Sequence, residues 1–274
     1  MPDPLYAELS RDLGSAQEAR WVLEDLALIE GTERAAAASA IVERRRRGEP
    51  LQYLLGHWSF RGLDLGVDAR ALIPRPETEG LVERALAVLG ARAGHLCAAD
   101  LGTGSGAIAC SLSVEAPGMG VDLDVIATDV DPGALDLAAE NVRRVGARRV
   151  ELRAGDWFDA LPAHLEGRLD LVCSNPPYVS RAARAQLARE LDYEPDIALV
   201  AHDGAGGAAG MAGVDAVLGG ARRWLAPGGT VLVEHGDDQR DAAVDSARRA
   251  GLVDVVDHDD LAGRPRVLEA RRGA

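Results

Sequence analysis

A buried strand and a rigid proline turn meet in the stretch Leu169-Asp170-Leu171-Val172-Cys173-Ser174-Asn175-Pro176-Pro177-Tyr178. The short apolar run at residues 171–173 predicts a strand in the interior of a parallel sheet. The two prolines that follow fix φ and remove two backbone N–H donors, so the strand ends in a stiff turn with bare carbonyl groups. In open α/β sheets, ligands bind outside the carboxyl ends of the strands. The stretch therefore predicts a ligand site around Asn175.

The same turn carries hydrogen-bond acceptors and an aromatic ring. The side-chain oxygen of Asn175 and a neighbouring carbonyl, held still, form two acceptors that suit one planar NH2 group, and Tyr178 offers a face for stacking. The alternative is a plain proline turn that closes a strand, with Asn as its first residue. From these four residues the two interpretations carry equal weight, so the rest of the chain has to separate them.

Size and composition set the broad class. The chain has 274 residues, of which 47% are hydrophobic and 27% charged, as expected for one large or two smaller globular domains. We find no uncharged apolar stretch of membrane-spanning length and no signal-peptide pattern at the N-terminus. The three cysteines lie far apart in apolar runs, without Cys-x-x-Cys pairs, and the histidines lack metal-ligand spacing. We expect a cytoplasmic protein without a metal.

The net charge of −14 argues against a dedicated nucleic-acid binder, because phosphate contacts need a concentrated basic surface. One basic run, at residues 44–47, has two interpretations. It fits a phosphate-binding patch, but the solvated carboxyl end of a helix is favoured, since cations are stabilised there.

Residues 1–50 read as a small helical unit. Ser15 and Glu18 form a capping-box pattern, Gly31 is placed to end that helix, and Thr32 to cap the next. These amphipathic helices are a packing unit or a partner-docking unit, and the sequence does not separate the two. Residues 51–75 predict a linker, since alternating apolar residues at positions 58–67 indicate a hairpin.

The segment Leu72-Ile73-Pro74-Arg75-Pro76-Glu77-Thr78-Glu79 is proline-rich and therefore extended and stiff. Its simpler interpretation is the start of a helix with Thr78 as the cap. The functional alternative is a rigid lip over a site. Spacing alone favours the simpler one.

A strand, a glycine-rich turn and a helix follow one another at residues 95–112. Alternate glycines in Leu101-Gly102-Thr103-Gly104-Ser105-Gly106 let the backbone approach a ligand, and the following helix offers free N–H groups. Asp129 ends the next strand, where an acidic residue is placed to bind ribose hydroxyls. The pair Asp156-Trp157 after a third strand fits either a nucleobase bracket or core packing.

Strands and helices alternate over residues 80–274, which predicts a doubly wound parallel sheet. A helix is expected at residues 182–191, a mobile Gly/Ala-rich loop at 203–213, a turn at 225–229 before a strand at 230–234, and a closing antiparallel pair at 252–270.

These motifs together resemble the HemK/PrmC family, protein-(glutamine-N5) methyltransferases that act on peptide chain release factors. The resemblance covers nearly the whole chain, and the combination of Pro-Arg-Pro-Glu-Thr-Glu with Asn-Pro-Pro-Tyr is its most specific part. Its stretches are Glu49-Pro50-Leu51-Gln52-Tyr53 with Gly56, residues 72–79, 100–106, 155–158 and 175–178, and the tail 260–267. The sequence departs from the family pattern at His235 and in a longer Gly/Ala segment at 204–213.

The resemblance implies a seven-stranded, Rossmann-like S-adenosylmethionine-dependent methyltransferase domain at residues 76–274, behind the helical unit 1–50, which would dock the substrate, and the hairpin linker 51–75. It places the cofactor's methionine portion over Gly102, Thr103, Gly104, Ser105 and Gly106. Asp129 would bind the ribose, and Asp156 with Trp157 the adenine, with Asn175 also close to the cofactor.

For the substrate, the resemblance implies that Asn175 and the Pro176 carbonyl accept the two amide protons of a glutamine. Pro177 and Tyr178 complete the substrate site, and Asn175, Pro176 and Tyr178 are the expected catalytic residues. S-adenosyl-L-homocysteine would be the product, release factors the partners and a monomer the working form. Neither a membrane nor a nucleic acid is an expected partner.

Three other functions remain to be weighed. An adenine-N6 or guanine-N2 methyltransferase uses a similar acceptor pair, but base flipping needs a basic surface that the composition does not provide. A non-catalytic nucleotide-binding module does not need the intact Asn-Pro-Pro-Tyr. A dinucleotide dehydrogenase shares the glycine turn but needs a second nucleotide-binding half.

Overall fold

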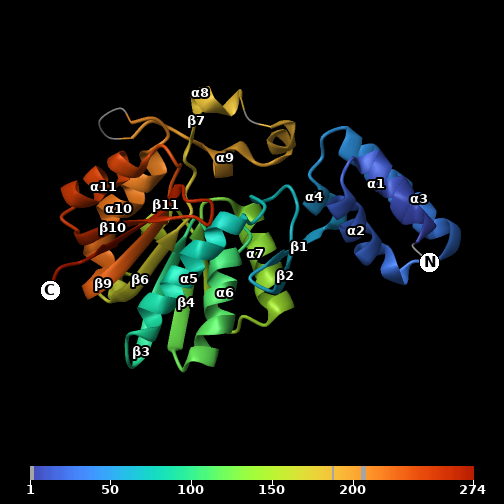
Figure 1. Cartoon of the computed structure of the whole chain (residues 1–274). Helices are drawn as coiled ribbons and strands as arrows, with labels where there is room; N and C mark the ends of the chain where they lie inside the picture. The colour runs from blue at the N-terminus through green and yellow to red at the C-terminus, as the bar shows by residue number, and fades with distance from the viewer. Residues whose placement is uncertain (1–2, 187, 205–207) are drawn as a thin grey trace.

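The computed structural model describes residues 3–186, 188–204 and 208–274 (Figure 1). Its helices and strands form a small N-terminal group of helices, a two-stranded hairpin and a larger α/β layer structure, in that order along the chain. Among the described residues, no helix combines the length and the apolar character needed to cross a membrane.

The N-terminal helices pack around their own apolar cluster. They are α1 (Pro4–Leu13), α2 (Ala16–Asp25), the short 3-10 helix η1 (Leu26–Leu28), α3 (Gly31–Arg46) and α4 (Leu51–Leu55). The buried cluster between them contains Leu9, Val22, Leu26, Ile41 and Leu51. Because Leu51 and the half-buried Leu54 belong to it, this packing continues past residue 50 into α4, at the start of the predicted linker.

The first helix boundary is confirmed and the next two are wrong. The Ser15 hydroxyl accepts the Glu18 N–H at 3.2 Å and caps α2, as the capping-box pattern predicts. Gly31 begins α3 instead of ending α2, and Thr32 lies inside α3 rather than capping it. The reason is that α2 ends earlier, at Asp25, and tightens into η1 before the chain turns.

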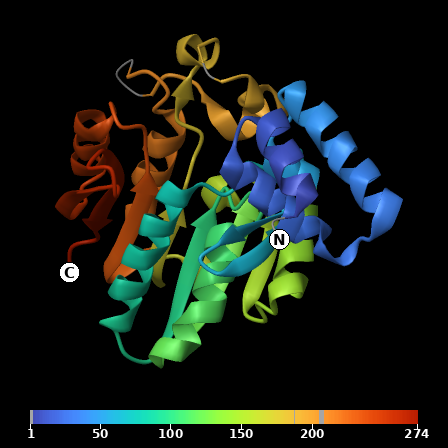
Figure 2. The same ribbon diagram turned by 45° about the vertical axis from the view of Figure 1, so that its right-hand side comes forward.

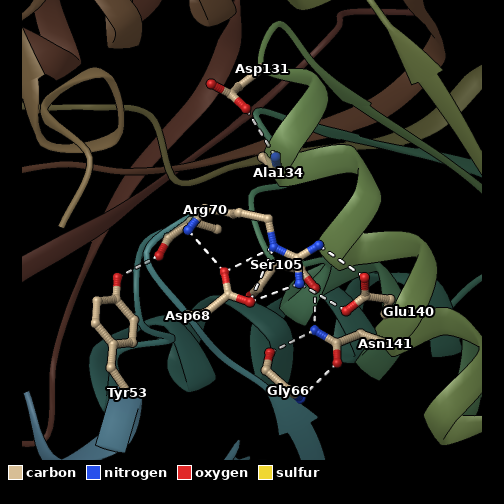
Figure 3. Close-up of polar contacts among 10 residues, drawn as sticks. Tyr53, Gly66, Asp68, Arg70, Ser105, Asp131, Ala134, Glu140 and Asn141 are labelled. Carbon is tan, nitrogen blue, oxygen red and sulfur yellow. Dashed lines mark hydrogen bonds and ion pairs between the residues drawn. The ribbon is translucent and has the colours of Figure 1, made fainter. Parts of the chain in front are cut away.

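The predicted hairpin is present and is tied to the larger layer. Strands β1 (His57–Phe60) and β2 (Leu63–Gly66) pair antiparallel. The amide of Asn141, buried on α7 (Pro132–Val145), accepts from Gly66 N and donates to Gly66 O and Ser105 O at 2.7–3.0 Å (Figure 3). One side chain thus joins the hairpin to the glycine-rich turn.

The main sheet confirms the predicted doubly wound architecture. Its seven strands lie in the order β10-β11-β9-β6-β3-β4-β5, with β3, β4, β5, β6 and β9 parallel and the β10–β11 pair antiparallel at one edge. The bounds are β3 (His95–Leu101), β4 (Asp122–Asp129), β5 (Val150–Ala154), β6 (Leu169–Ser174), β9 (Leu225–Glu234), β10 (Val253–Asp259) and β11 (Pro265–Arg271). The expected turn at 225–229 is already part of β9.

Helices cover both faces of this sheet (Figure 1). One apolar cluster joins the sheet to α5 (Pro76–Gly90), α6 (Ala107–Glu115) and α7. A second cluster joins the other face to α10 (Ala212–Trp224) and α11 (Arg240–Arg249). The short 3-10 helices η2 (Ala116–Met119), η3 (Trp157–Ala160) and η4 (Ala163–Leu165) connect these elements.

The strand order reverses between β3 and β6, because the chain builds outward from β3 through β4 and β5 and then returns to the other side of β3. The Ser174 hydroxyl donates to Leu101 O at 2.6 Å and holds the carboxyl ends of these two strands together. Such a switch point opens a crevice for a ligand. The glycine-rich turn follows β3 and Asn175 follows β6, so both reach this crevice.

The predicted helix at 182–191 is wrong. The structure instead has β7 (Val179–Ser180), α8 (Arg181–Arg184), η5 (Arg189–Tyr193), α9 (Asp196–Leu199) and β8 (Val200–Ala201), with β7 and β8 paired in parallel. This segment lies across the carboxyl ends of the strands, next to the N-terminal helices (Figure 2). Of the loop predicted at 203–213, residues 205–207 lie outside the described residues, and α10 already begins at Ala212.

Candidate active site

A cavity of about 270 Å³ lies at the switch point. One wall consists of the glycine-rich turn, the end of β4 and the start of α6. The other wall consists of residues 70–75 with Thr78 and of three residues before and within α9. Its lining includes Gly102, Thr103, Gly104, Ser105, Asp129, Asp156, Trp157, Asn175 and Pro177, together with Pro195, Ile197 and Ala198.

Most of the predicted site residues therefore meet in one place, and three do not reach the lining. Gly106, Pro176 and Tyr178 are absent from it. Gly106 lies behind the turn, where a Cβ atom would come within 3.3 Å of Ala138 on α7. Its lack of a side chain serves close packing between turn and helix.

The glycine-rich turn needs its glycines for two reasons. Gly102, Gly104 and Gly106 all have φ between 55° and 81°, which is the left-handed region that side chains disfavour. At Gly102 a Cβ atom would also lie 3.3 Å from the Trp157 ring. The turn thus brings its backbone directly against an aromatic ring, and both surfaces face the cavity.

Asp129 holds this turn from the end of β4. Its carboxylate accepts the N–H of Gly104 at 2.8 Å and that of Asp131 at 2.9 Å. Burial is the largest influence on this carboxyl group and raises its pKa above the usual value. The predicted ribose-binding residue is thus also a structural partner of the glycine-rich turn.

Asp100 is a residue of this region that the site prediction missed. It is 0% exposed at the end of β3, and its Oδ2 accepts from Thr103 Oγ1 at 2.6 Å and from Ala109 N at 3.1 Å. Its Oδ1 is buried without a hydrogen-bond partner in the described part of the chain, and burial raises the pKa of Asp100 to about 7. A lone acidic residue closing an apolar strand was the available signal.

Asp156 and Trp157 lie beside each other in the lining, at the end of the loop after β5. Asp156 is exposed, whereas Trp157 is half-buried with the strained φ of 43°. The Trp157 carbonyl accepts from Thr128 Oγ1 at 3.3 Å, which ties it to β4. Phe158, next along the chain, belongs to the core and stacks on Trp224. The polar-aromatic motif therefore divides between the cavity and the core.

Asn175 lines the cavity directly after the end of β6. Its Nδ2 donates to Thr78 Oγ1 at 3.0 Å. Pro177 also lines the cavity, whereas Pro176 is buried against α10, where a Cβ atom on Gly213 would come within 2.9 Å of it. Tyr178 Oη donates to Glu234 at 3.3 Å, and burial raises the pKa of this phenol.

Thr78 has a different role from the predicted one. Arg75 is the N-cap residue of α5, and Thr78 lies in the first turn with its hydroxyl donating to Glu234 Oε2 at 2.7 Å. The preferred interpretation of the proline-rich segment as only a helix start is also wrong, because residues 72–75 line the cavity. The segment forms a lip of the cavity, and the Thr78 hydroxyl points toward Glu234 at the end of β9.

Glu194 fastens this lip and was not recognised in the sequence. Its buried carboxylate accepts the Ile73 N–H at 3.0 Å and forms an ion pair with Arg75. The residues just before the lip, which also line the cavity, are held by two further contacts (Figure 3). The Tyr53 hydroxyl donates to Ala71 O at 2.8 Å, and Arg70 forms ion pairs with Asp68 and Glu140. The cavity wall at 70–75 thus depends on side chains from several distant segments.

Comparison with known proteins shows which family of proteins this chain resembles. A family model described as a methyltransferase domain matches residues 95–260. Release factor glutamine methyltransferases of Bordetella pertussis and Xylella fastidiosa are 44% and 42% identical to this chain, over 85% and 86% of it and 81% and 83% of their own lengths. The Escherichia coli protein of that name is 36% identical, over 87% of this chain and 81% of its own.

A solved structure supports the same fold. The crystal structure of a methyltransferase from Pyrococcus furiosus matches with a TM-score of 0.54 and 20% identity, covering 89% of this chain and 100% of that one. With identities of this size over most of both sequences, this chain belongs to the family of release factor glutamine methyltransferases.

Proposed function

We propose that this protein transfers a methyl group from S-adenosyl-L-methionine to the side-chain amide nitrogen (N5) of a glutamine in a peptide chain release factor. The observation that carries the proposal is the setting of Asn175. Its NH2 group donates to Thr78 Oγ1 at 3.0 Å, and Asn175 lines the same cavity as the glycine-rich turn. The names of the relatives support the choice of substrate.

The residues of the cavity fit S-adenosyl-L-methionine. The positive-φ glycines at 102 and 104 leave the backbone of the turn without side chains where it lines the cavity, and the Trp157 ring offers a flat apolar surface next to it. We infer that residues 102–105 hold the amino-acid end, Asp129 the ribose hydroxyls, and Asp156 with Trp157 the adenine. When bound, this cofactor supplies an electrophilic methyl group on a positively charged sulfur and leaves as S-adenosyl-L-homocysteine.

Asn175 and Pro176 prepare the substrate nitrogen. An amide nitrogen is a weak nucleophile because its lone pair is delocalised into the carbonyl. Two fixed acceptors, the Asn175 Oδ1 and the Pro176 carbonyl, would bind the two N–H groups and favour pyramidalisation as positive charge develops on nitrogen. Holding the nitrogen in line with the methyl group contributes about 7–11 kcal/mol in favourable cases. Transfer would form the N–C bond as the methyl–sulfur bond breaks with its electron pair going to sulfur, and one amide proton would leave to water.

We also propose a division of labour along the chain, in which residues 1–50 dock the release factor, 51–75 link, and 76–274 catalyse. The N-terminal helices have their own apolar core and touch the segment that covers the cavity, where Arg45 pairs with Glu190 at 2.8 Å and Tyr193 donates to Arg47 O at 3.3 Å. A monomer contains every residue named here. The unpaired cysteines fit a cytoplasmic protein.

The basic run at 44–47 gives no support to a nucleic-acid substrate. Each of its arginines is next to a carboxylate: the pairs are Arg44–Glu49, Arg45–Glu18, Arg46–Asp12 and Arg47–Glu43. Paired charges at a helix end neutralise one another, so they do not make a phosphate-binding patch. A protein substrate suits this acidic chain better than DNA or RNA.

The test is methyl transfer with labelled S-adenosyl-L-methionine to a release factor, to DNA and to ribosomal RNA in parallel. We expect label on one glutamine side chain of the release factor, located by mass spectrometry, and none on the nucleic acids. Faster transfer to a nucleic acid than to the release factor would reject the proposal in favour of a base methyltransferase.

A further inference from the structure

A chain of hydrogen bonds runs behind the cavity, from the end of β9 to the end of β6. It begins at Glu234, which is 0% exposed and does not line the cavity. Glu234 Oε2 accepts from Thr78 Oγ1 at 2.7 Å, and Thr78 Oγ1 accepts from Asn175 Nδ2 at 3.0 Å. A residue 59 positions away from Asn175 in the sequence therefore reaches it through one hydroxyl group.

The chemistry of these groups allows one direction for the hydrogen bonds. A carboxylate has acceptors only, so the single hydroxyl proton of Thr78 has to point at Glu234. With that proton used, the Thr78 oxygen can only accept. Asn175 must then turn its NH2 group toward Thr78, which leaves its Oδ1 atom as the end of the amide available to a ligand.

Resting on the glutamine transfer proposed above, we propose that Glu234 is a positioning residue which, through Thr78, fixes the Asn175 amide with its oxygen toward the substrate and so makes the site select a primary amide over a carboxylate. A glutamine side chain brings two N–H donors to the Asn175 oxygen and the Pro176 carbonyl. A glutamate side chain would bring a negative oxygen to the same two acceptors. Glu234 also accepts from Tyr178 Oη at 3.3 Å, so it holds two residues of the turn after β6.

The surroundings of Glu234 make the arrangement sensitive to pH. The pKa of Glu234 is raised to about 7, chiefly by burial. Glu77 on α5 adds a smaller raising effect, and the hydrogen bonds from Thr78 and Tyr178 and the charge of Arg266 on β11 act in the opposite direction. The neighbouring His235 is directed elsewhere, to Asp257 at 2.6 Å and Gly236 O at 2.8 Å, and Arg266 lies 3.9 Å from Asp260. Below a pH of about 7, a protonated Glu234 no longer obliges Thr78 to donate to it.

Thr78→Val is the first test, because it keeps the shape of the side chain and removes the hydroxyl. In single-turnover transfer to a release factor with saturating cofactor, we expect a loss of roughly a hundredfold or more, comparable to removal of one preorganised donor or acceptor. Thr78→Ser restores the hydroxyl and should recover most of the rate. Thr230→Val, which removes a buried hydroxyl from β9 outside the cavity, is the matched control and should behave as wild type.

Selectivity is the readout that a merely structural role would not change. The dissociation constants of an unmodified release factor and of one whose target glutamine is replaced by glutamate are compared for each variant. Wild type and Thr78→Ser should bind the glutamine form more tightly than the glutamate form. In Thr78→Val the ratio of the two dissociation constants should shrink by about tenfold, since Asn175 is then free to turn its NH2 group toward a carboxylate. An unchanged preference in Thr78→Val would overturn the proposal.

The pH profile tests Glu234 itself. With saturating cofactor, the wild-type rate should fall as pH drops through about 7, and in Glu234→Gln this fall should disappear, because an amide oxygen accepts from Thr78 without titrating. Glu269→Gln changes another buried carboxylate, bound to Arg84 and His258, and should keep the wild-type profile. A Glu234→Gln profile that coincides with the wild-type profile would overturn the role of Glu234. If wild type transfers no methyl group to glutamine, the proposed function fails instead.

Discussion

The two walls of the cavity are held in different ways. The glycine-turn wall, residues 102–105 with 129–131, is held by neighbouring strands: Asp129 accepts from Gly104, and Thr103 N donates to Thr128 O at 2.8 Å. The lip wall, residues 70–75 with 194–198, is held by side chains far apart in the sequence, such as Glu194 on Ile73. The first wall follows from strand pairing, whereas the second exists only when separate segments have packed.

This difference has a functional meaning. A wall built from paired parallel strands has little freedom, because any movement breaks the sheet. A wall fastened by a few side-chain contacts can release locally when one of them, such as that of the buried Glu194 carboxylate, is lost. We therefore expect changes in the glycine-turn wall to act on cofactor affinity, and changes in the lip wall to act on the opening of the cavity.

Asn175→Ala should have the largest effect on the rate of methyl transfer. It tests whether this rate can be lowered without changing cofactor binding by either wall. Removing one preorganised acceptor typically costs about a hundred- to a thousandfold in turnover. Cofactor affinity should change far less, since most of the lining belongs to other residues. The measurement is single-turnover methyl transfer together with calorimetry of cofactor binding. Wild-type turnover in this variant would show that Asn-Pro-Pro-Tyr here is only a turn.

Asp129→Ala should weaken the glycine-turn wall. We expect S-adenosyl-L-methionine to bind ~1.5–3 kcal/mol more weakly, the range for hydrogen bonds to a charged group. Titration calorimetry gives the dissociation constant, and Asp136→Ala on the exposed face of α7 is the control. Equal affinities for both variants would remove Asp129 from the cofactor site.

Glu194→Ala should loosen the lip wall. The variant leaves the Ile73 N–H and the Arg75 guanidinium without their buried partner, which costs about 1–3 kcal/mol for an unsatisfied group. We expect faster proteolysis near residues 70–75 and a faster cofactor off-rate, measured by limited digestion and stopped flow. Asp192→Ala, an exposed carboxylate two residues away, is the control. If the two variants release cofactor equally fast, Glu194 does not close the cavity.

Arg47→Ala should have the smallest effect on stability and on methylation, because Arg47 belongs to neither wall of the cavity. It gives the baseline against which the other variants are compared. Its partner Glu43 is 73% exposed at the side chain, and such surface pairs contribute about 0–1 kcal/mol. Thermal unfolding and release factor methylation should both match wild type. A clear loss of methylation with unchanged stability would instead place Arg47 in the docking surface.

The same contrast explains what the sequence predicted. The alternation of strands and helices, the glycine-rich turn, Asp129 and the turn at Asn175 all follow from local patterns of apolar residues, glycine and proline. The errors arise where a distant partner decides. Thr78 looks like a helix cap in the sequence, but in the structure its hydroxyl donates a hydrogen bond to Glu234, 156 positions away. Glu194 looks like a loop residue, but it binds Ile73 and Arg75. Short-range patterns carry no information about such pairs.

The Asn141 amide has a consequence for protein engineering. The amide is shared between β2 and the glycine-rich turn through three hydrogen bonds. The hairpin is therefore a rigid connection with a fixed orientation to the glycine-turn wall, and not a flexible tether. A chimaera that receives the N-terminal helices of another family member should therefore be spliced before His57, so that the native hairpin and its hydrogen bonds to Asn141 are both kept. A splice beyond Gly66 would bring in a foreign hairpin that does not match Asn141. We expect the first consequence to be a displaced glycine-turn wall, because Asn141 also binds Ser105 O.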